Sequence, residues 1–170
     1  PKLQPIELTG AARERASDVK SELLHGEVVA MAGGTRWHDR VGTALRTGLA
    51  RFADDSGCES FSSDLRIRVP DAGYLYPDAS SACGPMFDAD ECLLNPIVVW
   101  EVLSPSTEAR DRGAKFDAYR RIGSLRTYVL LSSSRPRATV FHLSPAGWLL
   151  NEVDGRRARI EIPSIGLVLE

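Results

Sequence analysis

The sequence predicts an α+β (mixed α/β) fold, with helices beside one mixed β-sheet, from three observations. Val41, Leu45, Leu49 and Phe52 recur at spacings of four, four and three, which is one apolar stripe of an amphipathic helix. The segment NPIVVWEVLS, residues 95–104, is almost continuously apolar and is typical of a central strand covered on both faces. Helical spacing returns after it, and short strand-like segments close the chain, an order that favours helices packed against a sheet.

The segments before the central strand alternate in type. We expect a short helical piece near residues 9–20, and then two short strands around the His25–Gly26 turn in SELLHGEVVAMAG. Thr35 is the expected N-cap of the amphipathic helix that follows. From residue 58 the hydrophobic residues recur with a period of two. CESFSSDLRIRVP predicts a strand with one wet face, and YLYPDASSACG, residues 74–84, predicts a further strand after a turn.

A second helix is expected directly after the central strand. In STEARDRGAKFDAYRRIGS, Phe116, Tyr119 and Ile122 fall on one side of a helix, and Ser106 or Thr107 can cap it. RTYVLLSSS, RATVFHLS, GWLLNEVD and ARIEIPS then predict four more short strands.

Length and composition predict one globular domain. The 170 residues suffice for a single domain over 1–170, with 1–20 as an N-terminal helical extension. A hydrophobic content of 43% and a charged content of 26% are ordinary for a soluble protein. No run of about 18 apolar residues occurs, so no membrane span is expected. The first segment, PKLQPIELTG, lacks the layout of a signal peptide, so we expect a cytoplasmic protein.

The cysteines and the net charge exclude some classes of function. Cys58, Cys83 and Cys92 form no C-x-x-C pair, so neither a disulfide nor a structural zinc site is expected, and thiols are the default. The net charge of −2 argues against a protein that coats nucleic acid through a broad basic field. It does not exclude an enzyme that meets a phosphodiester through a small local site and a bound metal ion.

Two carboxylates stand in segments that otherwise predict strands. Glu101 lies inside the central strand, and Asp78 directly follows Pro77, which removes a donor from the strand's hydrogen-bond ladder. An ionised carboxylate is costly to bury without a partner, and two carboxylates side by side raise each other's pKa unless a cation lies between them. Since Mg²⁺ and Mn²⁺ accept oxygen ligands and keep waters for chemistry, the pair predicts a metal site.

Lys115 is a third candidate. It follows Glu101 by 14 residues (115 minus 101), in the first turns of the second helix, and can reach over the sheet end. There it could position an attacking water or neutralise charge on a phosphate. Asp111, four residues earlier, is expected to form a surface ion pair with Lys115. Simpler interpretations stay open: Asp78 as a strand-edge residue bonding backbone amides, Glu101 as a carboxylate paired with an arginine, and Lys115 as a solvated lysine.

Several segments resemble the Uma2 family, formerly a domain of unknown function. They are YPD, GEVVAMAGGTRWHDRV, FSSDLRIRV and VVWEVLSPSTEARDRGAKFDAYRRIGSLRTYVLL, and together they extend over residues 20–168. The block EVLSPST followed by DRGxKxxxY is the most specific part. The resemblance implies the restriction-endonuclease-like fold of the PD-(D/E)xK nucleases, a central mixed β-sheet flanked by helices.

The resemblance also assigns roles to individual residues. Asp78 matches the aspartate of the PD element, and Glu101 matches the acidic residue of the (D/E)xK element. The lysine expected two residues after Glu101 is absent, because position 103 is Leu103, and Lys115 on the following helix is its substitute.

The resemblance therefore implies a Mg²⁺- or Mn²⁺-dependent endonuclease that hydrolyses phosphodiester bonds of DNA. Asp78 and Glu101 would bind the metal, and Glu27 and His38 are the nearest candidates for an accessory residue. A homodimer is expected because folds of this kind commonly act in pairs. The alternative is a catalytically inactive endonuclease-fold module for binding or assembly, which the acidic net charge and the missing lysine favour.

Overall fold

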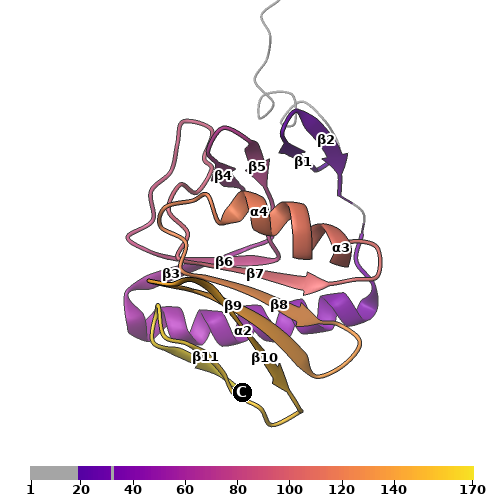
Figure 1. Cartoon of the computed structure of the whole chain (residues 1–170), viewed down its shortest axis with the longest axis vertical. Coiled ribbons are helices and arrows are strands. Elements are labelled where there is room, and N and C mark those ends of the chain that lie inside the picture. The colour runs from indigo at the N-terminus through magenta and orange to yellow at the C-terminus, as the bar shows by residue number, and fades with distance from the viewer. Residues whose placement is uncertain (1–18, 32) are drawn as a thin grey trace, which may run out of the picture.

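The computed structural model describes residues 19–31 and 33–170 (Figure 1). A six-stranded mixed sheet forms the centre, with the long helix α2 (Arg36–Ser56) on one face and a shorter helical segment on the other. Buried side chains of the sheet divide between two hydrophobic cores, one under each helical layer. The structure thus has the α+β fold that the sequence predicts.

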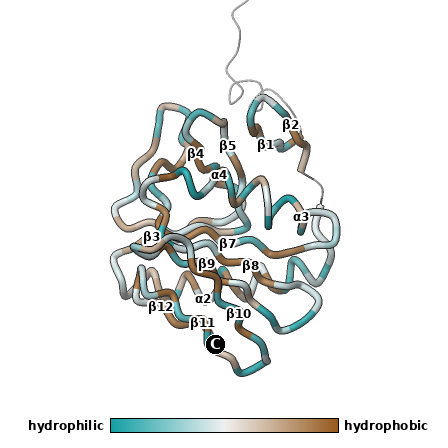
Figure 2. The backbone as a smooth tube through the Cα atoms, viewed as in Figure 1, coloured by the Kyte–Doolittle hydropathy of each residue, from teal (hydrophilic) through white to brown (hydrophobic). Residues whose placement is uncertain are grey.

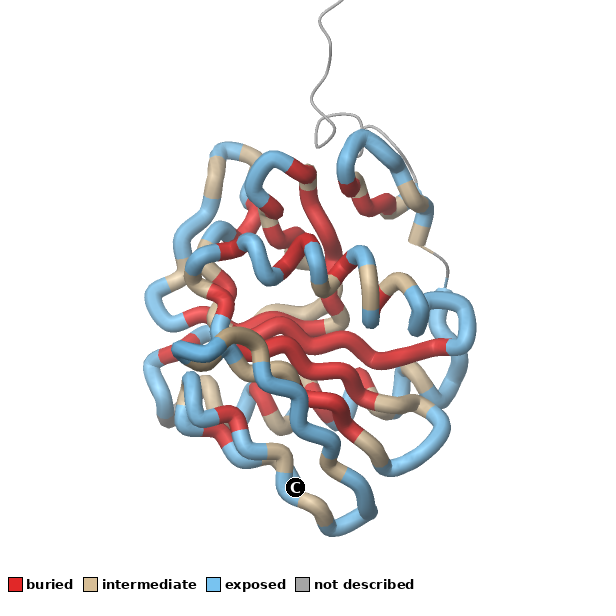
Figure 3. The backbone as a smooth tube through the Cα atoms, viewed as in Figure 1, coloured by how far each residue is buried: buried red, intermediate tan, exposed pale blue. Residues whose placement is uncertain are grey.

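The central sheet has the strand order β10-β9-β8-β7-β6-β3. Every neighbouring pair is antiparallel except β7 and β8, which are parallel and therefore need a crossover connection, here the shorter helical segment. Hydrophobic residues concentrate along β7 and β8 (Figure 2), and β6, β7 and β8 are buried along most of their length (Figure 3). The strands are β3 (Cys58–Ser62), β6 (Ala79–Cys83), β7 (Val98–Leu103), β8 (Thr127–Ser132), β9 (Arg137–Ser144) and β10 (Gly147–Asp154).

Two smaller sheets complete the described part of the chain. A four-stranded sheet has the order β2-β1-β5-β4, and β11 pairs with β12. The β1–β2 hairpin forms as predicted, whereas the last strand was not predicted. The bounds are β1 (Ser21–Leu24), β2 (Glu27–Ala30), β4 (Ile67–Val69), β5 (Gly73–Leu75), β11 (Ile160–Ile162) and β12 (Leu167–Leu169).

The two helical segments differ in how their N-termini are capped. Thr35 caps α2 as predicted, because its hydroxyl accepts the backbone N–H of His38 at 3.3 Å. The second segment runs from α3 (Glu108–Arg110) through a π-helical turn, η1 (Asp111–Lys115), into α4 (Phe116–Tyr119). Its N-cap residue is Thr107, but the predicted side-chain cap is not made, and Thr107 Oγ1 instead lies 3.0 Å from Ser104 Oγ.

Both predicted strands between residues 58 and 84 are broken in the structure. CESFSSDLRIRVP divides into β3 and β4, and YLYPDASSACG into β5 and β6, and in each case the two parts belong to different sheets. The predicted wet face is also wrong, because Arg66 is only 8% exposed and donates to the carbonyl oxygen of Asp90 at 2.8 Å. Of the helix expected near 9–20, residues 1–18 lie outside the described residues, and Val19 and Lys20 are not helical.

The expectation of three thiols is wrong. Cys58 and Cys83 are directly paired in the register of β3 and β6, and their sulfurs form a disulfide. Cys92 is a buried free thiol. Sequence spacing could not indicate this pair, because it depends on the register of two strands that are 25 residues apart. No helix among the described residues is long and apolar enough to cross a membrane.

Candidate active site

A cavity of about 900 Å³ lies where the central sheet, the β1–β2 hairpin, the first turns of α2 and the α3–η1 segment meet. We call it the cleft. Its lining contains most of the residues that the sequence singled out, together with several that it did not. The charged and histidine side chains of the cleft are Glu22, His38, Asp39, Arg46, Asp64, Asp78, Glu101, Arg110, Asp111 and Lys115.

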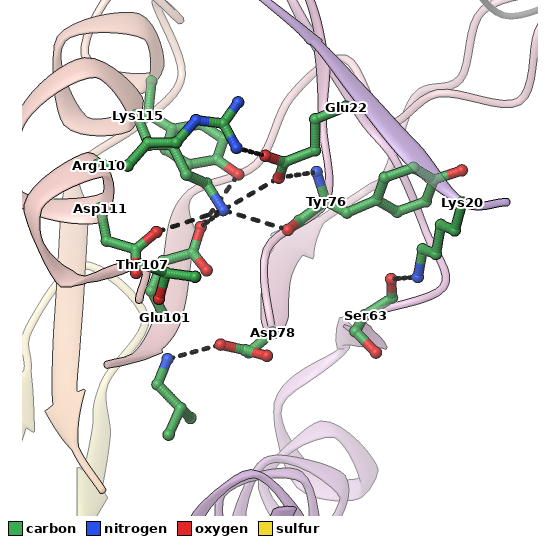
Figure 4. A network of polar contacts seen from close by, with 12 residues as sticks. Lys20, Glu22, Ser63, Tyr76, Asp78, Glu101, Thr107, Arg110, Asp111 and Lys115 are labelled. Carbon is green, nitrogen blue, oxygen red and sulfur yellow. Dashed lines mark hydrogen bonds and ion pairs between the residues drawn. The ribbon is translucent and has the colours of Figure 1, made fainter. Parts of the chain in front are cut away.

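The break between β5 and β6 places Asp78 beside β7. Ala79 pairs with Trp100, so the next position of the same register sets Asp78 opposite Glu101. The backbone of β6 pairs no further, and Asp78 Oδ2 accepts the N–H of Val102 at 2.6 Å in place of a strand carbonyl (Figure 4). The interpretation of Asp78 as a strand-edge residue that bonds a backbone amide is therefore correct, and the same contact fixes its carboxylate next to Glu101.

Glu101 points to the face of the sheet that the α3–α4 segment covers. Its strand neighbours Val99 and Leu103 pack in the core on that face, and alternate residues of a strand share a face. Glu101 is 3% exposed, and Tyr119 donates its hydroxyl to Glu101 Oε1 at 3.3 Å. The predicted central strand is confirmed, and so is the burial of its carboxylate.

Lys115 reaches from η1 into the centre of this polar cluster. Its Nζ lies 2.5 Å from Glu101 Oε1 and 3.1 Å from Glu22 Oε1. The same nitrogen lies 3.7 Å from Asp111 Oδ1, and it donates to the carbonyl oxygen of Tyr76 at 3.3 Å (Figure 4). Lys115 is 5% exposed and Asp111 is 3% exposed, so the interpretations of a solvated lysine and of a surface ion pair are both wrong.

Glu22 is the main residue that the sequence prediction missed. From β1 it accepts the backbone N–H of Tyr76 at 3.1 Å, and its other oxygen forms an ion pair with Arg110. Glu22 is 2% exposed, and the available signal in the sequence was a carboxylate directly before two leucines in the predicted strand SELL. Glu27, the predicted accessory residue, is instead exposed on β2 and does not line the cleft.

Burial and charge act against each other in this cluster. Burial raises the pKa of Glu101 well above its usual value, and repulsion from Asp111 and Asp78 adds to this while Lys115 opposes it. Burial also raises the pKa of Asp111, again against the attraction of Lys115. For Lys115, burial disfavours the charge, but the surrounding carboxylates, Glu101 foremost, outweigh burial and raise the pKa. Lys115 therefore stays protonated, beside two carboxyl groups, Glu101 and Asp111, whose pKa values are raised.

His38 enters the cleft from the first turn of α2. Its Nε2 lies 3.3 Å from Asp78 Oδ2, the oxygen that also accepts the Val102 amide. The hydrogen bond with Asp78 raises the pKa of His38, and partial burial of the ring opposes this shift. His38 is thus in contact with the predicted metal ligand Asp78, as an ion-pair partner of its carboxylate.

The oxygen atoms present fit a hard divalent cation with few protein ligands. Within the described ranges, no three or more His, Cys, Asp or Glu side chains are grouped so that they could chelate a metal. Asp78 Oδ1 and Glu101 Oε2, however, make no hydrogen bond or ion pair with another described residue. Mg²⁺ is usually held by one or two carboxylates and otherwise by water, so two such oxygens suit Mg²⁺ or Mn²⁺ better than Zn²⁺.

The fold is that of a restriction-endonuclease-like protein, and comparisons with known proteins agree. The Uma2 family model, described as "Putative restriction endonuclease", matches residues 7–170. The chain therefore belongs to the Uma2 family, which confirms the resemblance inferred from the sequence.

Two relatives come from Synechocystis sp. (strain ATCC 27184 / PCC 6803 / Kazusa). The uncharacterized protein slr1290 is 37% identical over 171 residues, which cover 98% of this chain and 88% of the relative. The uncharacterized protein sll1609 is 35% identical over 156 residues, which cover 88% and 87%. A crystal structure of "a putative nuclease belonging to DUF820 from Anabaena variabilis ATCC 29413" superposes with a TM-score of 0.71 at 14% identity, covering 88% of this chain and 85% of that one. That structure supports the fold alone.

Proposed function

We propose that this protein is a Mg²⁺- or Mn²⁺-dependent nuclease that hydrolyses phosphodiester bonds of DNA. One observation carries the proposal: Asp78, which bonds Val102 next to Glu101, lines one cleft together with Glu101 and its ion-pair partner, the buried Lys115. Membership of a family described as restriction endonucleases supports the same class of reaction.

Asp78 and Glu101 would hold the ion through Asp78 Oδ1 and Glu101 Oε2. When bound, such an ion polarises the phosphate and lowers the pKa of a coordinated water. The hydrogen bond from Val102 keeps the Asp78 carboxylate in position before the ion arrives, because it fixes Oδ2 at 2.6 Å. A nearby cation also favours the ionised form of Glu101, whose pKa burial otherwise raises.

Lys115 would act as a fixed positive charge and hydrogen-bond donor. Because its pKa is raised, it holds its proton at neutral pH and cannot serve as a general base. Its role would be to donate to the phosphate or to orient the attacking water, where a preorganised donor stabilises developing negative charge.

The test is a cleavage assay with single-stranded, double-stranded and branched DNA, with and without Mn²⁺, using the parent protein and the Glu101→Gln variant. We expect metal-dependent cleavage by the parent and a loss of at least about 100-fold in the variant. Glu59→Gln, which removes an exposed carboxylate from β3 outside the cleft, is the matched control. Calorimetry with Mn²⁺ should show weaker binding for Glu101→Gln, and unchanged Mn²⁺ binding would make the site assignment wrong.

A second candidate function is a binding or assembly module without catalysis. It is favoured by the finding that Lys115 already pairs with Glu101 and that Asp78 already bonds Val102, so these residues also stabilise the fold by themselves. This alternative requires that no DNA is cut and that Mn²⁺ does not raise the thermal stability.

The homodimer stays a prediction, which a measurement of the molar mass by light scattering tests.

A further inference from the structure

We propose that a second cavity, adjacent to the cleft, binds an unpaired nucleobase and its flanking phosphates in a single-stranded segment of the substrate. This inference rests on the proposed function. The second cavity has a volume of about 670 Å³, within the usual range of small-molecule sites. Trp37 lines it while the next residue, His38, lines the cleft, so the first turn of α2 separates the two cavities.

Trp37 is the first element of this site. It is 47% exposed, whereas Trp100 is buried in one core and Trp148 packs against the other. The guanidinium carbons of Arg36 and Arg40 lie 4.5 Å and 5.2 Å from the centroid of the Trp37 ring. An exposed indole is a surface on which an unpaired base stacks, such stacking tolerates any base, and the two nearby guanidinium groups add positive charge beside the ring.

The charge of the second cavity is opposite to that of the cleft. Its charged lining residues are Arg135, Arg137, Arg156 and a single acid, Glu170. Arg137 is held by Asp154 at 2.7 Å. Arg135 and Arg156 are exposed, and neither forms an ion pair with a described residue.

The arginines of the second cavity can offset the electrostatic repulsion between the acidic cleft and a polyanionic substrate. The chain has a net charge of −2, and the cleft is lined by six acidic residues against three arginine or lysine residues. Both would repel a polyanion. Phosphates held by Arg135 and Arg156 would offset that repulsion locally, because most nonspecific affinity for nucleic acid comes from neutralised phosphates.

The rest of the lining suits the flat, apolar face of a base. Val41, Leu131, Ala138, Val153 and Ile160 form the apolar part of the wall. A base can occupy such a site only after it leaves its stack, which costs more free energy in a duplex than in a single strand. The geometry therefore favours a single strand, or a single-stranded part of a branched DNA, over an intact duplex.

Fluorescence anisotropy of a labelled single-stranded oligonucleotide, measured in EDTA so that nothing is cleaved, tests the proposal. We expect Trp37→Ala to weaken binding about tenfold, the size of one lost base stack. The double variant Arg135→Ala/Arg156→Ala should weaken binding and flatten its salt dependence by roughly one unit of slope. Arg121→Ala, which removes an exposed arginine outside the second cavity, is the matched control and should behave as the parent does.

This inference and the proposed function can fail independently of each other. Equal binding by Trp37→Ala, the double variant and Arg121→Ala would overturn it, and so would a duplex that binds more tightly than the single strand. Glu101→Gln should lose cleavage while it keeps the oligonucleotide affinity measured in EDTA. If Glu101→Gln still cleaves but Trp37→Ala binds weakly, the proposed active site fails and the second cavity stands.

Discussion

At the end of β6, the carboxylate of Asp78 replaces a backbone carbonyl as the hydrogen-bond acceptor for Val102 of β7. Its Oδ2 accepts the Val102 N–H at 2.6 Å, directly beyond the last register pair, Ala79 with Trp100. Pro77 and the change of sheet end the backbone ladder here, so Val102, which is fully buried, would otherwise keep an unsatisfied N–H. One carboxylate thus completes the sheet with one oxygen and presents the other to the cleft.

The two roles of Asp78 can be separated by two substitutions. Asp78→Asn keeps an acceptor for the Val102 amide but loses the charge, so we expect nearly unchanged stability together with loss of Mn²⁺ binding. Asp78→Ala also leaves a buried N–H unpaired and should lower the free energy of unfolding by about 1–3 kcal/mol. Urea denaturation and Mn²⁺ calorimetry measure the two effects. Equal stability of the two variants would mean that the hydrogen bond does not support the sheet.

Replacing Lys115 should strongly destabilise the protein, because it is the ammonium that three buried carboxylates share. Lys115→Met removes the cation that contacts Glu101 and Asp111 and leaves Glu22 with Arg110, and we expect a loss of about 3–5 kcal/mol at neutral pH. Because the pKa values of Glu101 and Asp111 are raised, they accept protons readily as pH falls, and the loss should be smaller near pH 5. Adding Glu101→Gln to Lys115→Met should recover part of the stability, and a double variant no more stable than the single one would contradict the assigned pair.

The contact between His38 and Asp78 predicts a pH dependence of stability. The pKa of His38 in the folded protein lies above 6.5, chiefly because of Asp78. The ionised pair therefore contributes its full stability below pH 6.5, and this contribution is lost as pH rises through the folded-state pKa. In EDTA, between about pH 5.5 and about pH 8.5, the parent should lose stability relative to His38→Gln. Parallel curves for the two proteins would show that the pair contributes nothing.

The disulfide between Cys58 and Cys83 should contribute to stability only under oxidising conditions. It joins β3 to β6 across a sequence separation of 25, so we expect its loss to cost about 2–4 kcal/mol. Cys58→Ser/Cys83→Ser, measured by urea denaturation, should match the parent when both are in dithiothreitol and be less stable without it. A parent that gains nothing from oxidation would contradict this expectation.

The sequence predicted those parts of the fold that depend on local periodicity. The stripe on α2, the Thr35 cap and the buried strand β7 are each decided by residues within one element. The division of YLYPDASSACG between two sheets and the pairing of Cys58 with Cys83 depend on partners far along the chain, which periodicity does not report.

The same limit separates the cleft residues that the sequence singled out from those that it did not. Asp78 and Glu101 were singled out because a charge within or beside an apolar strand is conspicuous, and Lys115 because it follows Glu101 in the block EVLSPST to DRGxKxxxY. Glu22 was missed, and for Asp111 the ion pair with Lys115 was predicted but its burial was not. Their burial follows from meeting Lys115 in space, and the contact of Glu22 with Lys115 joins residues that are 93 positions apart (115 minus 22), which no local pattern indicates.

Glu22 and Glu27 offer a direct comparison, because both lie on the β1–β2 hairpin and only Glu22 reaches the cleft. Glu22 Oε1 lies 3.1 Å from Lys115 Nζ and accepts the Tyr76 amide, so Glu22 is a positioning residue for Lys115. We expect Glu22→Gln to keep the amide hydrogen bond and the fold but to lower kcat by about tenfold, with KM for DNA little changed. Glu27→Gln should leave both constants as in the parent, and the two proteins should have similar melting temperatures. A fall in kcat for Glu27→Gln, or none for Glu22→Gln, would mean that the accessory carboxylate is not the one that contacts Lys115.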